Sequence, residues 1–320
     1  MNFDFLLDNL TNPAFLFFIL GIVAVKLKSD LEIPPNSSKF ISLYLLFSIG
    51  FKGGQELAHS HFTIDILWSV LFGLFIASVI PIYTFFILKR RLSIENSGAI
   101  AAAYGSVSAV TFVTAVSFLE MQNNHFGGYL VAIMALMEAP AIIIGVMLVQ
   151  LYRKQKERLV SMKTVVAHSF TNGSVLLILG SLFIGLLASD KQARGIEPFT
   201  TDIFKGFLSI FLLDMGITSG RKLGDFFKNG LFTAIFAFLI PLINGCIVAY
   251  LSGFITTETG NRFIFAVLAA SASYIAVPAA MKMAVPQANP GLFLPMTLAV
   301  TFPFNITLGM PVYYLVVQNS

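Results

Sequence analysis

The chain has 320 residues, of which 57% are hydrophobic and 11% are charged, and its mean hydropathy is +0.83. Soluble domains carry about 25% charged residues, so this chain lacks the polar side chains needed to cover a water-facing surface. The net charge of +4 arises from 20 basic residues that lie between apolar runs rather than on one face, which excludes a nucleic-acid-binding protein. The single cysteine, Cys246, excludes an intrachain disulfide and a cysteine-based metal site. The sequence therefore predicts an all-α polytopic membrane protein.

Apolar runs that alternate with breakers predict ten membrane spans, since roughly 20 apolar residues cross a hydrocarbon core about 30 Å thick. The first run, Leu10 to Val25, follows the acidic Asp4 and Asp8 and precedes no small-residue cleavage site, so we expect it to be retained as a helix. Spans two and seven are expected to be short and interrupted. The predicted spans are residues 10–25, 39–54, 66–88, 96–119, 127–152, 167–188, 203–219, 230–255, 262–282 and 290–317.

The positions of Lys and Arg predict the orientation, because cytoplasmic loops retain basic residues. With the amino terminus outside, the inner loops hold fifteen of the 20 basic residues and the outer side holds five. This distribution indicates a multi-pass protein of the plasma (inner) membrane with both termini outside. The most basic loop, residues 153–165, is expected to be a cytoplasmic linker between two halves.

An internal repeat relates the two halves. Lys39 to Leu57 aligns with Lys205 to Leu223 at a constant offset of 166 residues. An odd number of spans per half makes the second half enter the membrane from the opposite side, and inverted repeats of this kind are common in secondary transporters. We therefore expect two inverted five-helix repeats, residues 1–152 and 166–320, with a substrate site near the midplane. Further landmarks that keep nearly the same offset are Gly21 with Gly185, Pro81 with Pro241, Ser106 with Ser271, Ser108 with Ser273, and Pro140 with Pro303.

Spans four and nine carry small and hydroxyl residues where an uninterrupted helix would be apolar. Gly and Pro weaken helix continuity, and Ser or Thr side chains can cap the freed backbone groups. If both helices break there, two helix N-termini meet near the bilayer centre, and each offers unpaired N–H groups and about half a positive charge to a small anion. Carbonyls at the opposing C-terminal ends would suit Na⁺. Small residues can instead serve only close helix packing, but two motifs at symmetric positions favour the site. These residues are Gly105, Ser106, Ser108 and Thr111 in span four, and Ser271, Ser273 and Tyr274 in span nine.

Two acidic residues lie within predicted spans, Glu138 in span five and Asp214 in span seven. An acid at the midplane costs about 2.5–3.5 kcal/mol on insertion scales, so it is a functional candidate by default. For Glu138 we expect a cation-linked or gating role, with a buried structural hydrogen bond as the alternative. Asp214 is expected to face a water-filled cavity or a subunit contact. In span ten, Thr301, Asn305 and Thr307 flank a proline and either line the site or cap a kink.

Five segments distributed over the chain resemble the SbtA-type sodium-dependent bicarbonate symporters. The resemblance implies an elevator-type transporter with ten spans in two inverted repeats, broken helices four and nine, and a core part that moves against a gate part in a homotrimer. It also implies uptake of bicarbonate with Na⁺ as the coupling ion, no cofactor, and inhibition by a small PII-like protein on the cytoplasmic side. The segments are Tyr104 to Thr111, Met137 to Ala141, Leu213 to Gly216, Ala269 to Pro278 and Val285 to Pro290.

The resemblance also assigns roles to individual residues. The acid before the proline of span five falls on Glu138, where the better-known members carry Asp. This chain departs from those members at Ala109 and Val110, where they carry Gly-Ser, and at Tyr274, where they carry an Asp that could help to bind Na⁺. We group Glu138, Tyr274 and Asp214 as cation-linked, and expect no metal beyond Na⁺ at the substrate site. The anion site that the resemblance implies consists of Gly105, Ser106, Ser108, Thr111, Ser271 and Ser273.

Other functions stay open at this point. A carrier for another small anion or carboxylate, a cation/proton exchanger that uses Glu138, and a passive channel would share much of this pattern. Paired catalytic aspartates in adjacent spans, a His-Glu-x-x-His helix and a Gly-x-Ser-x-Gly turn are all absent from the sequence, which argues against an intramembrane enzyme.

Overall fold

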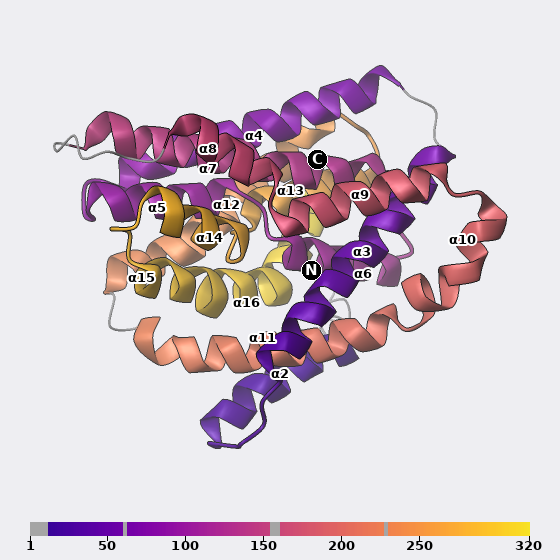
Figure 1. The fold of residues 1–320 in the computed structure, drawn as a ribbon, viewed down its shortest axis with the longest axis horizontal. Coiled ribbons are helices and arrows are strands. Elements are labelled where there is room, and N and C mark those ends of the chain that lie inside the picture. Colours follow the sequence, from indigo (N-terminus) through magenta and orange to yellow (C-terminus); the bar gives the residue numbers. More distant parts are fainter. Residues whose placement is uncertain (1–11, 60–62, 154–160, 227–229) are drawn as a thin grey trace.

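The computed structural model describes residues 12–59, 63–153, 161–226 and 230–320, and the regular structure within them is entirely helical (Figure 1). The α-helices are α2 (Pro13–Lys26), α3 (Pro35–Ala58), α4 (Ile64–Leu88), α5 (Ile94–Gly105), α6 (Ala109–Met121), α7 (Tyr129–Tyr152), α8 (Met162–Phe170), α9 (Gly173–Leu187), α10 (Asp190–Glu197), α11 (Phe204–Phe226), α12 (Leu231–Leu251), α13 (Thr259–Ala270), α14 (Ala276–Ala284), α15 (Pro290–Pro295), α16 (Phe302–Phe304) and α17 (Met310–Gln318). Short π-helical segments cover Pro198–Asp202, Met296–Thr301 and Asn305–Gly309, and a 3₁₀ turn covers Ser252–Phe254.

Each predicted span overlaps one helix or a run of consecutive helices. Among the described residues, six runs are long and apolar enough to cross a membrane, which agrees with an integral membrane protein; the assignment of ten spans stays a prediction. Shorter apolar helices cover Pro13–Lys26, Gly173–Leu187 and Thr259–Ala270. The six runs are Ile64–Leu88, Ile94–Met121, Tyr129–Tyr152, Asp190–Leu223, Leu231–Phe254 and Pro290–Gln318.

The expectation that spans two and seven are short and interrupted is wrong. Helices α3 and α11 run without a break over 24 and 23 residues. Glycine and lysine residues inside these helices make contacts with neighbouring helices. Lys52 forms an ion pair with Glu120 at 3.5 Å, and a Cβ added at Gly54 would lie 2.0 Å from the carbonyl oxygen of Leu182.

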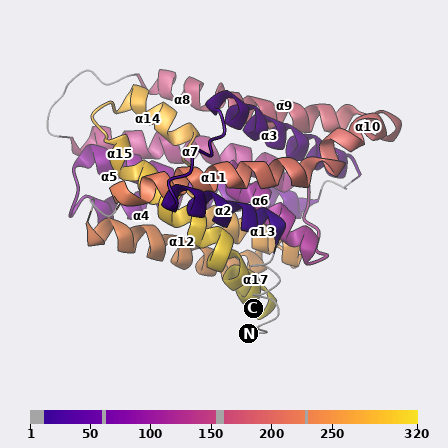
Figure 2. The same ribbon diagram turned by 90° about the horizontal axis from the view of Figure 1, so that it is seen from below.

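Two helix pairs that join the halves of the chain have closely apposed backbones. Helix α2 packs along α11 and α3 packs along α9 (Figures 1 and 2). A Cβ at Gly216 would lie 2.1 Å from the carbonyl oxygen of Phe18, and one at Gly185 would lie 2.2 Å from that of Phe51. Only glycine permits such approach of one backbone to another. In the predicted sequence repeat α2 corresponds to α9 and α3 to α11, so the repeat exchanges one pair with the other.

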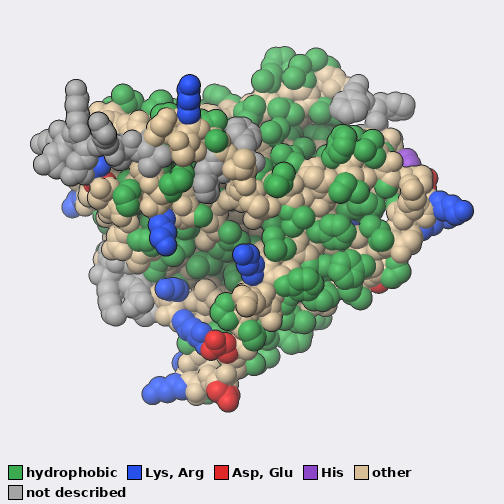
Figure 3. All heavy atoms as spheres, viewed as in Figure 1, with side chains coloured by type: hydrophobic (Ala, Val, Ile, Leu, Met, Phe, Trp, Pro, Cys, Tyr) green, Lys and Arg blue, Asp and Glu red, His purple; other side chains and the backbone are tan. Residues whose placement is uncertain are grey.

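The remaining long helices form a second group around the two predicted breaks. Helix α4 packs on α5 and α7, whereas α12 packs on α13 and α17. Hydrogen bonds join these sets: the Tyr83 hydroxyl donates to the Asn244 side chain, and the hydroxyls of Tyr104 and Thr301 lie 2.7 Å apart. Figure 3 shows hydrophobic side chains over much of one face of the molecule, as contact with lipid requires.

Candidate functional site

The helix of span four breaks where the sequence predicts it. Helix α5 ends at Gly105, Ser106 is extended with ψ of 173°, and α6 begins at Ala109. The Ser108 side chain caps α6 by accepting a hydrogen bond of 3.2 Å from the Thr111 amide, as N-cap serines commonly do. A Cβ at Gly105 would lie 2.4 Å from Cδ of Pro81, so α5 ends in close contact with α4.

The helix of span nine breaks in the same way. Helix α13 ends at Ala270, Ser271 is extended with ψ of 166°, and α14 begins at Ala276. The Ser273 hydroxyl accepts from the amide of Val277 at 3.4 Å. In each break one serine ends the first half-helix and another serine, two residues later, accepts from an amide of the second half-helix.

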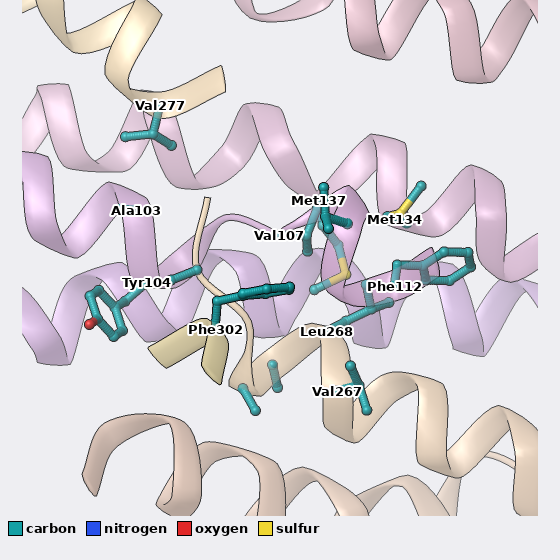
Figure 4. Packing of buried hydrophobic residues seen from close by; sticks show 14 of the residues in the cluster. Ala103, Tyr104, Val107, Phe112, Met134, Met137, Val267, Leu268, Val277 and Phe302 are labelled. Carbon is teal, nitrogen blue, oxygen red and sulfur yellow. The ribbon is translucent and has the colours of Figure 1, made fainter. Parts of the chain in front are cut away.

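Hydrogen bonds join the two breaks to each other. The Ser273 amide donates to the Ala103 carbonyl at 2.8 Å, and the Ser108 amide donates to the Ser271 hydroxyl at 3.0 Å. The Ser271 hydroxyl in turn donates to the Leu268 carbonyl at 2.9 Å. Apolar side chains surround this crossing, with Val107, Met137 and Leu268 among those labelled in Figure 4. Because these polar groups are buried, their pairing fixes the geometry of both breaks.

A small cavity lies at the crossing and brings together four of the predicted site residues: Ser108, Ser273, Tyr274 and Glu138. Glu138 is 4% exposed, and its Oε2 makes no hydrogen bond to any described residue. The volume of the cavity is about 10 Å³, near the minimum that holds one water molecule. In this conformation the cavity therefore fits a water molecule or a small cation more closely than it fits a polyatomic anion.

The other predicted site residues do not line this cavity. Gly105 packs on α4, Thr111 donates to the Ser108 cap, and Ser271 bridges the two breaks. The Ser106 hydroxyl is buried and makes no hydrogen bond to a described residue. Asp214 lies in a separate vestibule.

That vestibule is a cleft of about 440 Å³ between α3, α11 and the chain that precedes α3. The Ser38 hydroxyl donates to the Asp214 carboxylate at 2.5 Å, and Arg221 pairs with Glu32 at 3.4 Å near the entrance. Asp214 thus faces a cleft, one of the two environments that its sequence predicts. Tyr274, Ile275 and Ser174 line both the vestibule and the small cavity. The vestibule and the cavity are therefore adjacent.

The opposite end of α3 carries two more pockets, of about 320 and 240 Å³. Lys52 and Glu56 line both of them. The Glu120 carboxylate at the end of α6 pairs with Lys52 at 3.5 Å and with Lys205 of α11 at 3.3 Å. Clefts thus lie at both ends of α3. The small cavity contacts α3 at Leu46, between the residues of α3 that line these clefts.

Several residues of the site were not identified from the sequence. Ser174 and Leu46 line the small cavity from α9 and α3. Ser174 follows a polar stretch in which Asn172 caps α9, and that stretch was the available signal. Asn305, which the sequence left between two roles, donates to the Ala270 carbonyl at 2.8 Å and so holds the end of α13, whereas Thr307 donates to the Pro303 carbonyl within its own helical run.

The metal-ligating residue types do not gather in the part of the chain that the structure describes, where no group of three or more His, Cys, Asp or Glu side chains could hold a metal ion. The small cavity is lined by the Glu138 carboxylate, and the vestibule is lined by Glu32, Lys39, Asp214 and Arg221.

Comparison with protein families gives one match. The family model described as the Na⁺-dependent bicarbonate transporter superfamily matches residues 13–318, which is nearly the whole chain and includes both breaks and Glu138. Comparison with curated proteins gives no match.

Proposed function

The chain belongs to the Na⁺-dependent bicarbonate transporter superfamily, and from this membership we propose that it imports bicarbonate together with Na⁺ across the plasma membrane. One observation carries the proposal: the N-terminal ends of α6 and α14 and the buried Glu138 carboxylate line a single cavity. This cavity lies where the two helix breaks are hydrogen-bonded to each other. Such crossings of broken helices suit an anion and a coupling cation together.

Bicarbonate would bind to the half-helix ends. Each N-terminus contributes about half a positive charge, and Ser108 and Ser273 add hydroxyl groups at the same place. Among the described residues that line the cavity there is no Lys or Arg. A site that binds its anion through dipoles rather than through a full charge can release the anion after transport.

Na⁺ would bind on the side of Glu138. The Glu138 carboxylate and the hydroxyls of Ser108 and Ser273 would supply oxygen ligands for a hard cation. The bound cation would offset the charge of the anion, because each unit charge moved through the membrane feels about 2.3 kcal/mol per 100 mV. In this scheme the coupling of Na⁺ to bicarbonate depends on Glu138. Tyr274 contributes only a neutral hydroxyl at the position where the better-known family members carry the carboxylate of an Asp.

Movement would follow an elevator-like scheme. The closely packed pairs α2 with α11 and α3 with α9 would form the gate part, and α4 to α7 with α12 to α17 would form the core part that carries both breaks. Clefts at the two ends of α3 would be the access routes from the two sides of the membrane. The inverted repeat, the homotrimer, the outward position of both termini and a PII-like regulator belong to the same proposal. Residues 154–160 of the proposed cytoplasmic linker lie outside the described residues.

The test is uptake of isotope-labelled bicarbonate into proteoliposomes at fixed pH, with an inward Na⁺ gradient compared with an equal K⁺ gradient. Accumulation with Na⁺ alone supports the proposal, and uptake equal to that of empty liposomes contradicts it. Ser108→Ala and Ser273→Ala each remove a hydroxyl group from the cavity, and loss of one hydrogen bond to the anion, worth about 1 kcal/mol, should raise the KM for bicarbonate about fivefold. Ser209→Ala is the matched control, because the Ser209 hydroxyl bonds only within α11 and lies outside the site.

A second candidate function is a cation/proton exchanger. It is favoured by the buried Glu138 carboxylate, whose Oε2 has no hydrogen-bond partner among the described residues and so could exchange a proton for a cation. Na⁺ flux that follows a pH gradient in the absence of bicarbonate, and that Glu138→Gln abolishes, would favour exchange over symport.

A further inference from the structure

Tyr274 lies at the boundary between the small cavity and the vestibule. It belongs to the non-helical link between α13 and α14, where the backbone is not held by helix hydrogen bonds. Tyr274 lines both the small cavity and the vestibule, together with Ile275 and Ser174. Of these three side chains that of Tyr274 is the largest, so it contributes most to the wall between the spaces.

The two ends of the Tyr274 side chain have different environments. The ring packs edge-on against Phe302, with the ring centroids 6.1 Å apart. The hydroxyl is buried near the Ser108 side chain at the start of α6, yet it makes no hydrogen bond of normal geometry to a described residue. The side chain therefore reaches from the α13–α14 link across to the cap of the opposite broken helix. Rotation of the ring is therefore opposed by its packing on Phe302 rather than by a hydrogen bond of normal geometry.

Entry of a polyatomic anion into the cavity requires such a movement. At about 10 Å³ it cannot hold a polyatomic anion, whereas the adjoining vestibule of about 440 Å³ can. Solvent reaches the vestibule, since Glu32 and Arg221 at its entrance have side chains that are 58% and 52% exposed. Any solute that passes between the vestibule and the crossing has to pass the three side chains that line both spaces.

We propose that Tyr274 is the gate of the small cavity on the vestibule side: its ring closes the cavity in this conformation, and rotation of the ring opens it to the vestibule. The solute that passes is bicarbonate if the proposed function holds, but closure by the ring does not depend on which solute is carried. The gate is local, because it needs a change of one side chain and of the link that carries it.

The experiment measures access to the cavity by thiol labelling without any substrate. In a Cys246→Ser background, Ala109→Cys places a thiol on the wall of the small cavity, and Thr218→Cys places one in the vestibule as a reference. Purified protein in lipid nanodiscs is treated with a small charged methanethiosulfonate reagent, so that both faces are accessible and no orientation is assumed. With Tyr274 present, the thiol at 109 should react at least tenfold more slowly than the thiol at 218.

Two variants of Tyr274 and one control variant separate the possibilities. Tyr274→Ala should raise the labelling rate at 109 at least tenfold, whereas Tyr274→Phe, which keeps the ring, should leave it slow. Ile275→Ala is the matched control, because this side chain lines the same two spaces and should leave labelling at 109 slow. Equal rates in the Tyr274→Ala and unmodified proteins, or equally fast labelling in Ile275→Ala, would overturn the proposal.

Two internal checks complete the design. Unchanged labelling at 218 in every variant reports that the vestibule is intact and that Tyr274→Ala is folded. Because no bicarbonate or Na⁺ is present, a failure of the symport proposal leaves this result unaffected, and a failure of the gate proposal leaves Na⁺-driven uptake unaffected.

Discussion

Replacing Gly216 with alanine should destabilise the protein through the contact between α2 and α11. The added Cβ would lie 2.1 Å from the Phe18 carbonyl oxygen and 3.1 Å from the Gly21 Cα. Both are backbone atoms, so no side-chain rotation relieves the overlap. Restoring a contact of 3.4 Å requires α2 to move by about 1.3 Å, the difference between 3.4 and 2.1 Å. Overpacking of this kind costs about 1–3 kcal/mol, which lowers the folded-to-unfolded ratio about 5- to 150-fold.

Gly206 in the same helix is the matched control, because nothing lies within 4 Å of a Cβ added there. Gly206→Ala should stabilise the helix, by up to about 1 kcal/mol, since alanine favours helix more than glycine does. The assay is unfolding in mixed micelles with increasing dodecyl sulfate, followed by circular dichroism. The same contrast is expected between Gly185→Ala, whose Cβ would lie 2.2 Å from the Phe51 carbonyl oxygen, and Gly180→Ala, whose Cβ has open space. Equal stability of the Gly216→Ala and Gly206→Ala proteins would refute the close contact.

Further predictions concern the buried polar groups. Glu138→Gln should leave the yield of folded protein equal or higher, because an acid costs about 2.5–3.5 kcal/mol in the membrane, while it removes the Na⁺ dependence of bicarbonate uptake measured over a range of Na⁺ concentrations. Asn305→Leu should lower stability by about 1–3 kcal/mol in the same unfolding assay, because the Ala270 carbonyl and the Tyr313 hydroxyl both lose a partner. Asn319→Leu, at an exposed position near the C-terminal end of the chain, should change stability little; an equal loss at both positions would argue against a special role of Asn305.

The positions of the helix breaks could be predicted from the sequence because they depend on local chemistry. Serines that cap half-helices and glycine that ends one are visible as residue types at symmetric positions, and the structure breaks both helices there. The same local reasoning failed for α3 and α11. A glycine that permits close packing and a glycine that ends a helix look alike in sequence, and the difference lies in the neighbouring helix, such as the Leu182 backbone beside Gly54.

The composition of the cavity could be predicted only in part. Ser108, Ser273 and Glu138 are polar residues within predicted membrane spans, where such residues are uncommon, so their residue types alone make them candidates. Ser174 and Leu46 line the same cavity from helices far away in sequence; the polar stretch at Asn172 is the signal for Ser174, and nothing in the surroundings of Leu46 indicates its role. The vestibule at Asp214 depends on how the chain before α3 lies against α11, which is a property of tertiary packing.

The hydrogen bond from the Ser273 amide to the Ala103 carbonyl has a consequence for synthesis of the protein. The two groups are 170 residues apart in the chain. The Ala103 carbonyl therefore has no Ser273 amide to accept from until the second half of the chain has entered the membrane. Until then the end of α5 and the cap of α6 lack partners that they have in the finished molecule, and unsatisfied backbone groups in lipid cost several kcal/mol each. Helices α5 and α6 therefore cannot complete their folding before α13 and α14 have been inserted, and a chain truncated after α7 would remain a substrate for membrane quality control.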